Sequence, residues 1–441
     1  MQIPGVSEVF PPRPQPSSGV GFLAAVGLAA SWVAAVALAE SAGPDFVINF
    51  EVRPPLFHPA HGLALLSVTA AGMLAALRGR FRLLTIEGRI ALVVSVAGAA
   101  VWAASSYTLE ELLSPVIFGA TGPFVWFTLV FVLVGTEHRV WVVIDPVIRL
   151  LAYATSGLAL WTLVHSASST YVAGFTKHTQ YSILLMWLGG WTLLSATRLR
   201  GWRLVARATP FVVLILTAIY SQARSWTILA LLLGATFVFL RAREQGSTLG
   251  GARTVVMICV LAVVAGAIAS RTILSGTIEG FANRFDDDTR SMQYLDFFSV
   301  VPVSDLLLGR GPKGTWYWYG VGDYQYFDNG LLWMLFVGGV PTLLSYVAIV
   351  VWPAIRAFRK NLRGQDAAAV CLVLFWGVAL TGFSTYTLPS VAISSYLVSL
   401  WAGRCYLILA ESDLRTERIR RGHLLRSWPP YRRPEAANAG R

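Results

Sequence analysis

The sequence predicts an all-α polytopic membrane protein with about twelve transmembrane helices and one large extracytoplasmic loop that carries short helices. Three observations predict this class. Hydrophobic residues make up 55% of the chain and charged residues 13%, whereas soluble domains carry about 25% charged residues. Apolar runs of membrane length recur along the chain, and the basic residues gather in alternate connections between them, as in multi-pass proteins.

Each predicted span is an apolar run close to the roughly 20 residues that cross a bilayer as a helix. The runs at 209–220 and 226–240 are shorter, so we expect either tilted helices or a break in the membrane between them. Asp145 and Pro146 crowd the start of the run at 147–164. The predicted spans are 20–38, 60–77, 89–106, 116–134, 147–164, 181–197, 209–220, 226–240, 254–270, 330–351, 367–382 and 391–410.

The distribution of Lys and Arg predicts which connections lie on which side. With a cytoplasmic N-terminus, 26 of the 35 basic residues fall on the cytoplasmic side and 8 on the opposite side. Anionic lipid headgroups attract such residues, so the net charge of +12 indicates a bilayer rather than nucleic acid as the partner. The predicted segments are a cytoplasmic N-terminal segment (1–19), a bundle of about nine spans (20–270), a large periplasmic loop (271–329), the C-terminal spans (330–410) and a basic cytoplasmic tail (411–441).

The first apolar run also resembles part of a signal peptide. It ends in Ala37-Leu38-Ala39, like a signal-peptidase site. The stretch before it is rich in proline and holds one arginine, which is a poor match to the basic start of a signal peptide. We therefore expect a retained first span.

The cysteines and the C-terminal tail favour simple structural roles. Cys259, Cys371 and Cys405 lie in or beside apolar spans without metal-ligand spacing, so buried free thiols are expected. The tail after Glu411 is predicted to begin as an interfacial helix and to end disordered.

Arg224 lies between the two short apolar runs. An arginine at membrane depth costs about 2.5–3.5 kcal/mol on insertion scales unless it is paired or hydrated. Two interpretations stay open: a guanidinium that reaches the interface, or a cation that faces a polar cavity and binds an anion. Ser221, Gln222 and Ser225 surround it with hydrogen-bonding groups, which favours the second.

The long loop contains an acidic run followed by a predicted helix. Three aspartates at 286–288 precede a helix expected over 289–300, which ends before Pro302. The aspartates indicate either a solvated helix start or a site for Mg²⁺ or Mn²⁺. Adjacent carboxylates rarely all face one ion, so we expect no metal. Arg284 is placed to pair with the last aspartate, and Arg290, Gln293, Tyr294 and Phe297 share one face of the helix.

Two further groups in the loop could contact a ligand. Arg310 and Lys313 lie in the glycine-rich stretch 308–314, where backbone could approach a phosphate closely, although the spacing is not that of a P-loop. Trp316 and Trp318 follow. They are either an interfacial aromatic belt or a stacking platform for sugar rings.

Asp328 and Asn329 stand at the entry to the next span. Asp328 is either the cap of that helix or a general base in a partly dry site. The local sequence leaves both roles open.

The order of these motifs resembles the O-antigen ligase and polymerase superfamily of membrane glycosyltransferases. Five features carry the resemblance, over about 209–345: Ser-Gln-Ala-Arg-Ser at 221–225 before a short apolar span, the large late periplasmic loop, Arg290 at a helix, the Leu-Gly-Arg-Gly turn at 308–311, and Asp328-Asn329 before a glycine-rich span. Each motif is short and unspecific alone, so their order and sidedness carry the resemblance.

The resemblance implies a bacterial inner-membrane enzyme whose active site faces the periplasm. Its donor would be an oligosaccharide on a polyprenyl diphosphate, its second substrate a glycan acceptor, and no cofactor would be needed. Family ligases have His-Asn where this chain has Asp328-Asn329, which favours a repeat-unit polymerase over a ligase that transfers glycan to a lipid A-core acceptor. Chain length would be set either here or by a partner regulator.

The resemblance also implies roles for individual residues. Arg224 and Arg290, helped by Arg284 and Arg310, would neutralise the diphosphate, and Asp328 would take a proton from the acceptor hydroxyl. Lys313, Tyr294, Trp316, Trp318 and Asn329 would complete the substrate surface. A polysaccharide or lipid transporter is the alternative from another class, but polar or broken segments in two matching halves are not evident in the sequence.

Overall fold

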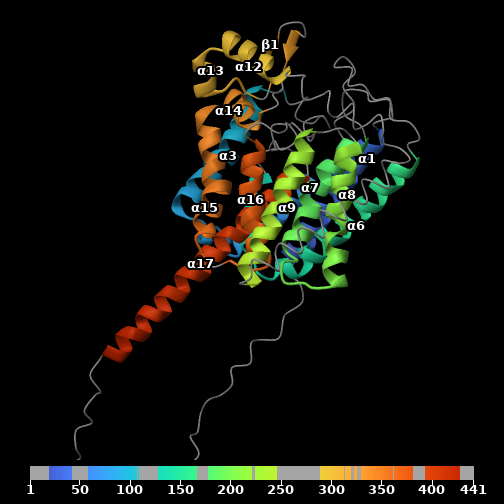
Figure 1. Cartoon of the computed structure of the whole chain (residues 1–441). Helices are drawn as coiled ribbons and strands as arrows, with labels where there is room; N and C mark the ends of the chain where they lie inside the picture. Colours follow the sequence, from blue (N-terminus) through green and yellow to red (C-terminus); the bar gives the residue numbers. More distant parts are fainter. Residues whose placement is uncertain are drawn as a thin grey trace, which may run out of the picture.

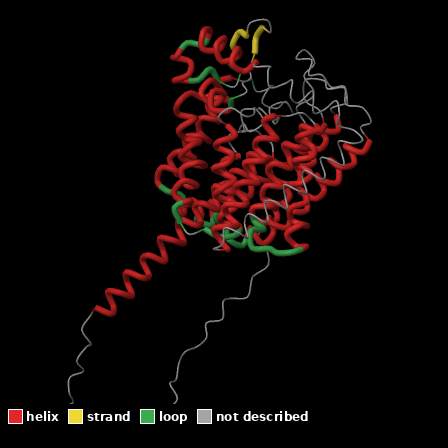
Figure 2. Tube along the Cα trace, in the orientation of Figure 1, coloured by secondary structure: helices red, strands yellow, loops and turns green. Residues whose placement is uncertain are grey.

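The computed structural model describes a helical bundle with a small cap at one end. The described residues are 19–41, 58–106, 108, 128–165, 177–220, 224–245, 289–311, 313–318, 322–324, 329–360, 362–380 and 393–427. The helices stand roughly side by side, as Figure 1 and Figure 2 show.

Eight helical runs among the described residues are long and apolar enough to cross a membrane. The predicted span at 254–270 and most of that at 116–134 lie outside these residues, so the total of about twelve stays a prediction. The eight are α1 (Gly19–Ser41), α2 (Pro59–Leu77), α3 (Ile86–Ser106), α6 (Val140–His165), α8 (Trp202–Tyr220), α9 (Arg224–Gln245), a run that starts with α14 (Gly330–Tyr346), and α17 (Ile393–Ser427).

Helix α7 (Lys177–Leu194) lies at the centre of the bundle. Every residue from Tyr181 to Leu194 is buried, as expected for a helix that is apolar on all sides. Its Trp191 stacks between Trp141 of α6 (5.3 Å between ring centroids) and Trp401 of α17 (5.9 Å). The guanidinium of Arg404 in α17 lies over the ring of Trp141, 4.7 Å from its centroid. This aromatic stack therefore joins three helices.

Ion pairs gather the arginine-rich connections at one end of the bundle. Glu137, before α6, pairs with Arg78 after α2 at 3.4 Å, and Glu244 near the end of α9 pairs with Arg198 after α7 at 3.4 Å. The Glu244 carboxylate also accepts a hydrogen bond from the backbone N–H of Gly364, before α16 (Gln365–Leu380), at 2.6 Å. We call this the arginine-rich end.

Other helix termini lie at the opposite end of the bundle. Tyr181, in the first turns of α7, donates a hydrogen bond to Glu40 at the end of α1. The ring of His178 lies 4.5 Å from that of Tyr220 at the end of α8. The described helices therefore separate the two sets of connections as the arginine pattern predicts.

Three predicted boundaries are wrong. Helix α6 begins at Val140 rather than 147, α8 at Trp202 rather than 209, and α9 reaches Gln245. The two spans predicted to be short are thus 19 and 22 residues long. Apolar runs miss these turns because they contain charged residues whose charges have partners in the fold. Asp145 pairs with Arg149 within α6, and Arg241 near the end of α9 donates to the carbonyl of Leu199 at 2.8 Å.

Glycine allows one close helix contact. In the short α5 (Val132–Gly135), a Cβ on Gly135 would lie 2.0 Å from the carbonyl oxygen of Leu400 in α17, and one on Gly403 would lie 2.0 Å from that of Val132. Small residues let membrane helices approach at backbone distance. A 3₁₀ turn, η1 (Arg80–Leu83), also lies at the arginine-rich end.

The run that starts with α14 is not one regular helix. Gly339 has φ 67° and ψ −176°, so the helix is interrupted inside the apolar run. The chain then continues through a π-helical turn, η4 (Val347–Val351), into α15 (Trp352–Phe358). The predicted span at 330–351 is therefore a broken helix that reaches the arginine-rich end.

Candidate functional site

The candidate site is the end of the bundle opposite the arginine-rich end. A cap formed by α12 (Thr289–Val300), α13 (Val303–Leu308) and a two-stranded hairpin sits there on the start of α14 (Figure 1). This cap is the described part of the predicted large loop at 271–329. Two short helices are present in this stretch, as predicted, while the extent of the loop and its side of the membrane stay predictions.

Helix α12 forms over the predicted residues 289–300 and ends before Pro302. Its buried face packs on the hairpin and on α14: the ring of Phe297 lies 5.3 Å from Trp316 and 5.8 Å from Phe336. Tyr294, predicted to bind substrate, lies half-buried on the same helix. Aromatic contacts in an edge-to-face arrangement therefore fix the cap on the bundle.

The hairpin keeps the two tryptophans of the predicted sugar platform stacked on one strand but buries one of them. Strand β1 (Trp316–Trp318) pairs antiparallel with β2 (Gly322–Tyr324). Trp316 is 1% exposed, so its faces are covered by the cap itself, whereas Trp318, 6.2 Å from it, stays partly exposed. The hairpin thus makes Trp316 a core residue, while Trp318 keeps part of its surface exposed.

The glycine-rich turn is inserted against the break in α14. The backbone N–H groups of Arg310 and Gly311 donate to the carbonyl oxygens of Phe336 at 2.7 Å and Val337 at 2.9 Å. A Cβ on Gly309 would lie 2.6 Å from the nitrogen of Gly339. A break in a helix leaves some carbonyl groups without the N–H donors of the next turn. The glycine-rich turn supplies N–H donors for two of these carbonyl groups.

The side chain of Arg310 holds the turn together. Its Nε donates to Asp305 Oδ2 and its Nη1 to the carbonyl of Thr315, both at 2.6 Å, and its guanidinium lies 5.8 Å from the centroid of Phe336. The predicted role in binding a diphosphate would compete with these contacts. Lys313, in the same turn, is exposed.

Asn329 begins α14. Its Oδ1 accepts hydrogen bonds from the backbone N–H groups of Leu331 at 3.0 Å and Leu332 at 3.2 Å, which is the usual geometry of an N-cap. The helix entry therefore has its cap in Asn329, and the cap role considered for Asp328 is already filled.

Of four predicted residues, two are placed by their backbone alone and two lie outside the described part of the chain. Arg224 is the first residue of α9 and Arg290 the second of α12, so both backbones lie at the candidate end. The side chains of these two arginines lie outside the described part of the chain, as do Asp328 and Arg284. Their proposed contacts stay predictions.

The structure adds a polar group that the motif analysis missed. His178 and Tyr220 are buried at the candidate end, and their rings are in contact. Tyr181, three residues after His178 on α7, donates a hydrogen bond to Glu40. A histidine and two tyrosines at the termini of apolar spans were the available signal. Arg224 follows Tyr220 by four residues, so this group borders the start of α9.

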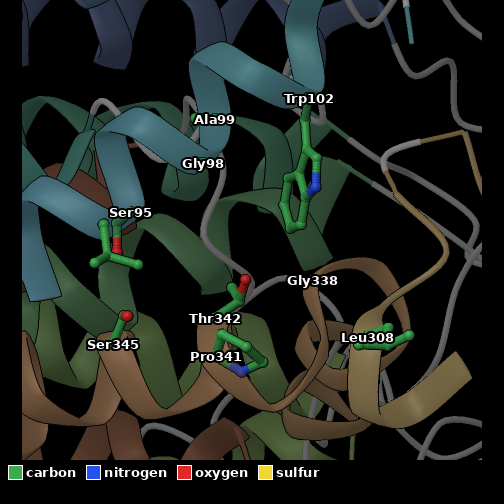
Figure 3. A pocket seen from close by; sticks show the side chains of 10 residues that line it. Ser95, Gly98, Ala99, Trp102, Leu308, Gly338, Pro341, Thr342 and Ser345 are labelled. Atoms are coloured by element: carbon green, nitrogen blue, oxygen red, sulfur yellow. The ribbon is translucent and has the colours of Figure 1, made fainter. Parts of the chain in front are cut away.

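A cavity lies between α3 and α14, directly below the cap. It has a volume of about 230 Å³. Trp102 and Leu308 stand at one end of it, with Ser95 and Ser345 at the other (Figure 3). The break in α14 contributes Gly338, so the cavity exists where the regular helix stops. Its lining residues are Val94, Ser95, Gly98, Ala99, Trp102, Leu308, Gly338, Pro341, Thr342 and Ser345.

Fold and site together define an all-α multi-pass membrane protein with a capped, discontinuous helix at one end of its bundle. Comparisons of the chain with protein-family models, with curated proteins and with solved structures returned no match.

Proposed function

We propose that the protein is a membrane glycosyltransferase that joins oligosaccharide repeat units carried on polyprenyl diphosphate. The observation that supports the proposal is the cap, whose turn 308–311 is held on a broken membrane helix at the end with few basic connections. A charged lipid-linked donor needs such an arrangement, because cations must meet its diphosphate at the headgroup level while its tail stays in the bilayer.

The proposed reaction is an inverting transfer. An acceptor sugar hydroxyl attacks the anomeric carbon of the donor glycan, the bond from that carbon to the diphosphate oxygen breaks, and polyprenyl diphosphate leaves. Asp328 takes the hydroxyl proton. Arg224 and Arg290, with Arg284, stabilise the negative charge that grows on the leaving group, a task that does not require a metal ion.

The contacts of the cap refine the proposed roles. Arg310 is committed to Asp305 and Thr315, so we assign it to holding the turn at the break rather than to direct diphosphate binding. Trp318 and Tyr294 keep accessible surface for sugar rings. Lys313 is exposed at the same end and would contribute a further positive charge.

The cavity between α3 and α14 suits the lipid part of the donor. Most of its lining is apolar or small, and it begins next to Leu308 under the cap. A prenyl chain seated there would leave its diphosphate at the level of the turn 308–311. The substitution Gly98→Leu would place a side chain in this cavity. It should therefore weaken donor binding, which would be measured as a higher KM for the lipid-linked donor.

The experiment is transfer by the purified full chain in proteoliposomes that contain the lipid-linked oligosaccharide. The proposal expects a ladder of longer lipid-linked glycans and release of polyprenyl diphosphate. Asp328→Asn should lower the rate about 10²–10⁴-fold, since a positioned base contributes that factor, and Arg224→Gln and Arg290→Gln should also weaken donor binding. Lys360→Gln, on the arginine-rich side, is the matched control.

Two alternatives predict different products. A ligase would leave glycan length unchanged and move whole chains onto a lipid A-core acceptor. A transporter would carry labelled glycan or lipid across the proteoliposome membrane without forming a glycosidic bond. Full activity in Asp328→Asn would remove that residue as the base in the glycosyltransferase proposal.

A further inference from the structure

A second charged group lies at the arginine-rich end, on the outside of the bundle where α6 meets α8. Arg149 of α6 pairs with Asp145 one turn earlier on the same helix. Arg207 of α8 has Arg149 and Asp145 as its charged neighbours across the helix contact. Arg203, one turn earlier on α8, is exposed.

The positive charge of this group exceeds its negative charge. Asp145 is the one carboxylate near Arg207 among the described residues, and it is already fully engaged: Oδ1 accepts from Trp191 Nε1 at 2.9 Å, and Oδ2 pairs with Arg149. Arg149 Nε is buried and has no hydrogen-bond partner within the described part of the chain. Arg149 and Arg207 thus share this carboxylate, and Arg203 adds a third positive charge one turn earlier on α8.

The surroundings of the group are those of a lipid-facing surface. Leu150 of α6 is 67% exposed and Trp202 of α8 76% exposed, and both helices qualify as membrane spans. Tyr153 joins the two helices, because its hydroxyl donates to the carbonyl of Ala206 at 2.9 Å. Tyrosine and tryptophan are typical of the headgroup level of a membrane.

We propose that Arg149, Arg203 and Arg207 form a binding site for the phosphate headgroup of an anionic phospholipid. Guanidinium groups bind phosphate oxygens through paired N–H donors, and basic pockets between membrane helices bind anionic headgroups. The exposed apolar residues beside them would contact the acyl chains. A free phosphate could satisfy the same guanidinium groups but would leave that apolar surface unused.

The site is separate from the proposed catalytic end and does not depend on glycan transfer. Because it bridges α6 and α8, a bound headgroup would offset repulsion between Arg149 and Arg207 across the contact of these helices. Retention of the lipid should therefore be accompanied by a higher melting temperature of the full chain in detergent.

The test is native mass spectrometry of the full chain, taken from nanodiscs that contain cardiolipin, phosphatidylglycerol and phosphatidylcholine. We expect retained cardiolipin or phosphatidylglycerol and little phosphatidylcholine. The double variant Arg203→Gln/Arg207→Gln should lower that retention about fivefold per arginine. Arg203→Lys/Arg207→Lys keeps the charge but loses the paired N–H donors, so it should retain more lipid than the glutamine variant and less than the wild type.

The matched control is Arg359→Gln/Arg363→Gln, which removes two exposed arginines from the same end of the bundle. It should leave lipid retention unchanged. Three outcomes would overturn the proposal. The control could lose as much anionic lipid as the Arg203→Gln/Arg207→Gln variant, that variant could retain as much anionic lipid as the wild type, or the wild type could retain phosphatidylcholine as well as it retains the anionic lipids. Displacement of the lipid by millimolar inorganic phosphate would also overturn it, in favour of a free-phosphate site.

Discussion

At the scale of single residues, Asn329 has two competing roles that one substitution can separate. Its Oδ1 caps α14 through Leu331 and Leu332. Aspartate caps helices as well as asparagine does, whereas alanine costs about 1 kcal/mol. If the cap is its main task, Asn329→Asp should keep the melting temperature and activity, and Asn329→Ala should lower the melting temperature.

The control for this experiment lies in the kinetics. If Asn329 instead donates its amide N–H to substrate, Asn329→Asp would keep the melting temperature but raise the KM for the donor. A raised KM with unchanged stability would therefore contradict a purely structural role.

Residue chemistry limited how much of the candidate site the sequence could predict. Arg310 and Trp316 have the residue types of a phosphate and sugar site, yet Asp305, Thr315 and Phe297 engage them. These partners become neighbours only when the turn and the hairpin fold back on the cap. Residue type predicts the chemistry available, and tertiary contacts decide which groups remain available for a ligand.

At the scale of elements, the break in α14 depends on two glycines in contact. Gly309 has φ 83° and Gly339 φ 67°, values that side-chain-bearing residues adopt only at a cost of about 1–3 kcal/mol. A Cβ at either position would also meet backbone atoms at about 2.6 Å or less. Gly309→Ala should therefore lower the melting temperature and activity together.

Gly157→Ala provides the comparison, because a Cβ there meets no atom within 4 Å in the regular helix α6. It should be neutral or slightly stabilising. If Gly309→Ala were as mild as Gly157→Ala, the contact between the turn and the broken helix would be unnecessary for the fold.

Elements with clear start and stop signals were predicted well, and interrupted or charged ones were not. Helix α12 begins after the aspartates and ends before Pro302, as expected. The start of α6 was missed because Asp145 is buried through its bond to Trp191, a partner 46 residues away. The break at Gly339 was missed because the turn that supplies its donors lies in another element.

At the scale of the whole molecule, the two ends of the bundle should be accessible from opposite sides of the membrane. Arg139 and Arg359 lie exposed at the arginine-rich end, and Lys313 lies exposed on the cap. Single Arg139→Cys, Arg359→Cys and Lys313→Cys variants can be tested with an impermeant thiol reagent. Intact cells should label only Lys313→Cys, and permeabilised cells should label all three.

The background for this labelling is low at two native positions, since Cys371 and Cys405 are buried; Cys259 is replaced by serine in all variants. Labelling of Arg139→Cys in intact cells would reverse the predicted sidedness. The proposed catalytic end would then face the cytoplasm, where the outer-leaflet donor is absent.

The proposed activity of this protein is the lengthening of glycans on a polyprenyl diphosphate. The most direct measurement is the ladder of surface glycans, with the pool of lipid-linked glycans, in the native host that lacks the gene and carries either the wild-type chain or Asp328→Asn. We predict single repeat units without the protein or with Asp328→Asn, and long chains with the wild type. Long chains stranded on the polyprenyl carrier, beside unmodified acceptor lipid, would contradict polymerisation and indicate a ligase.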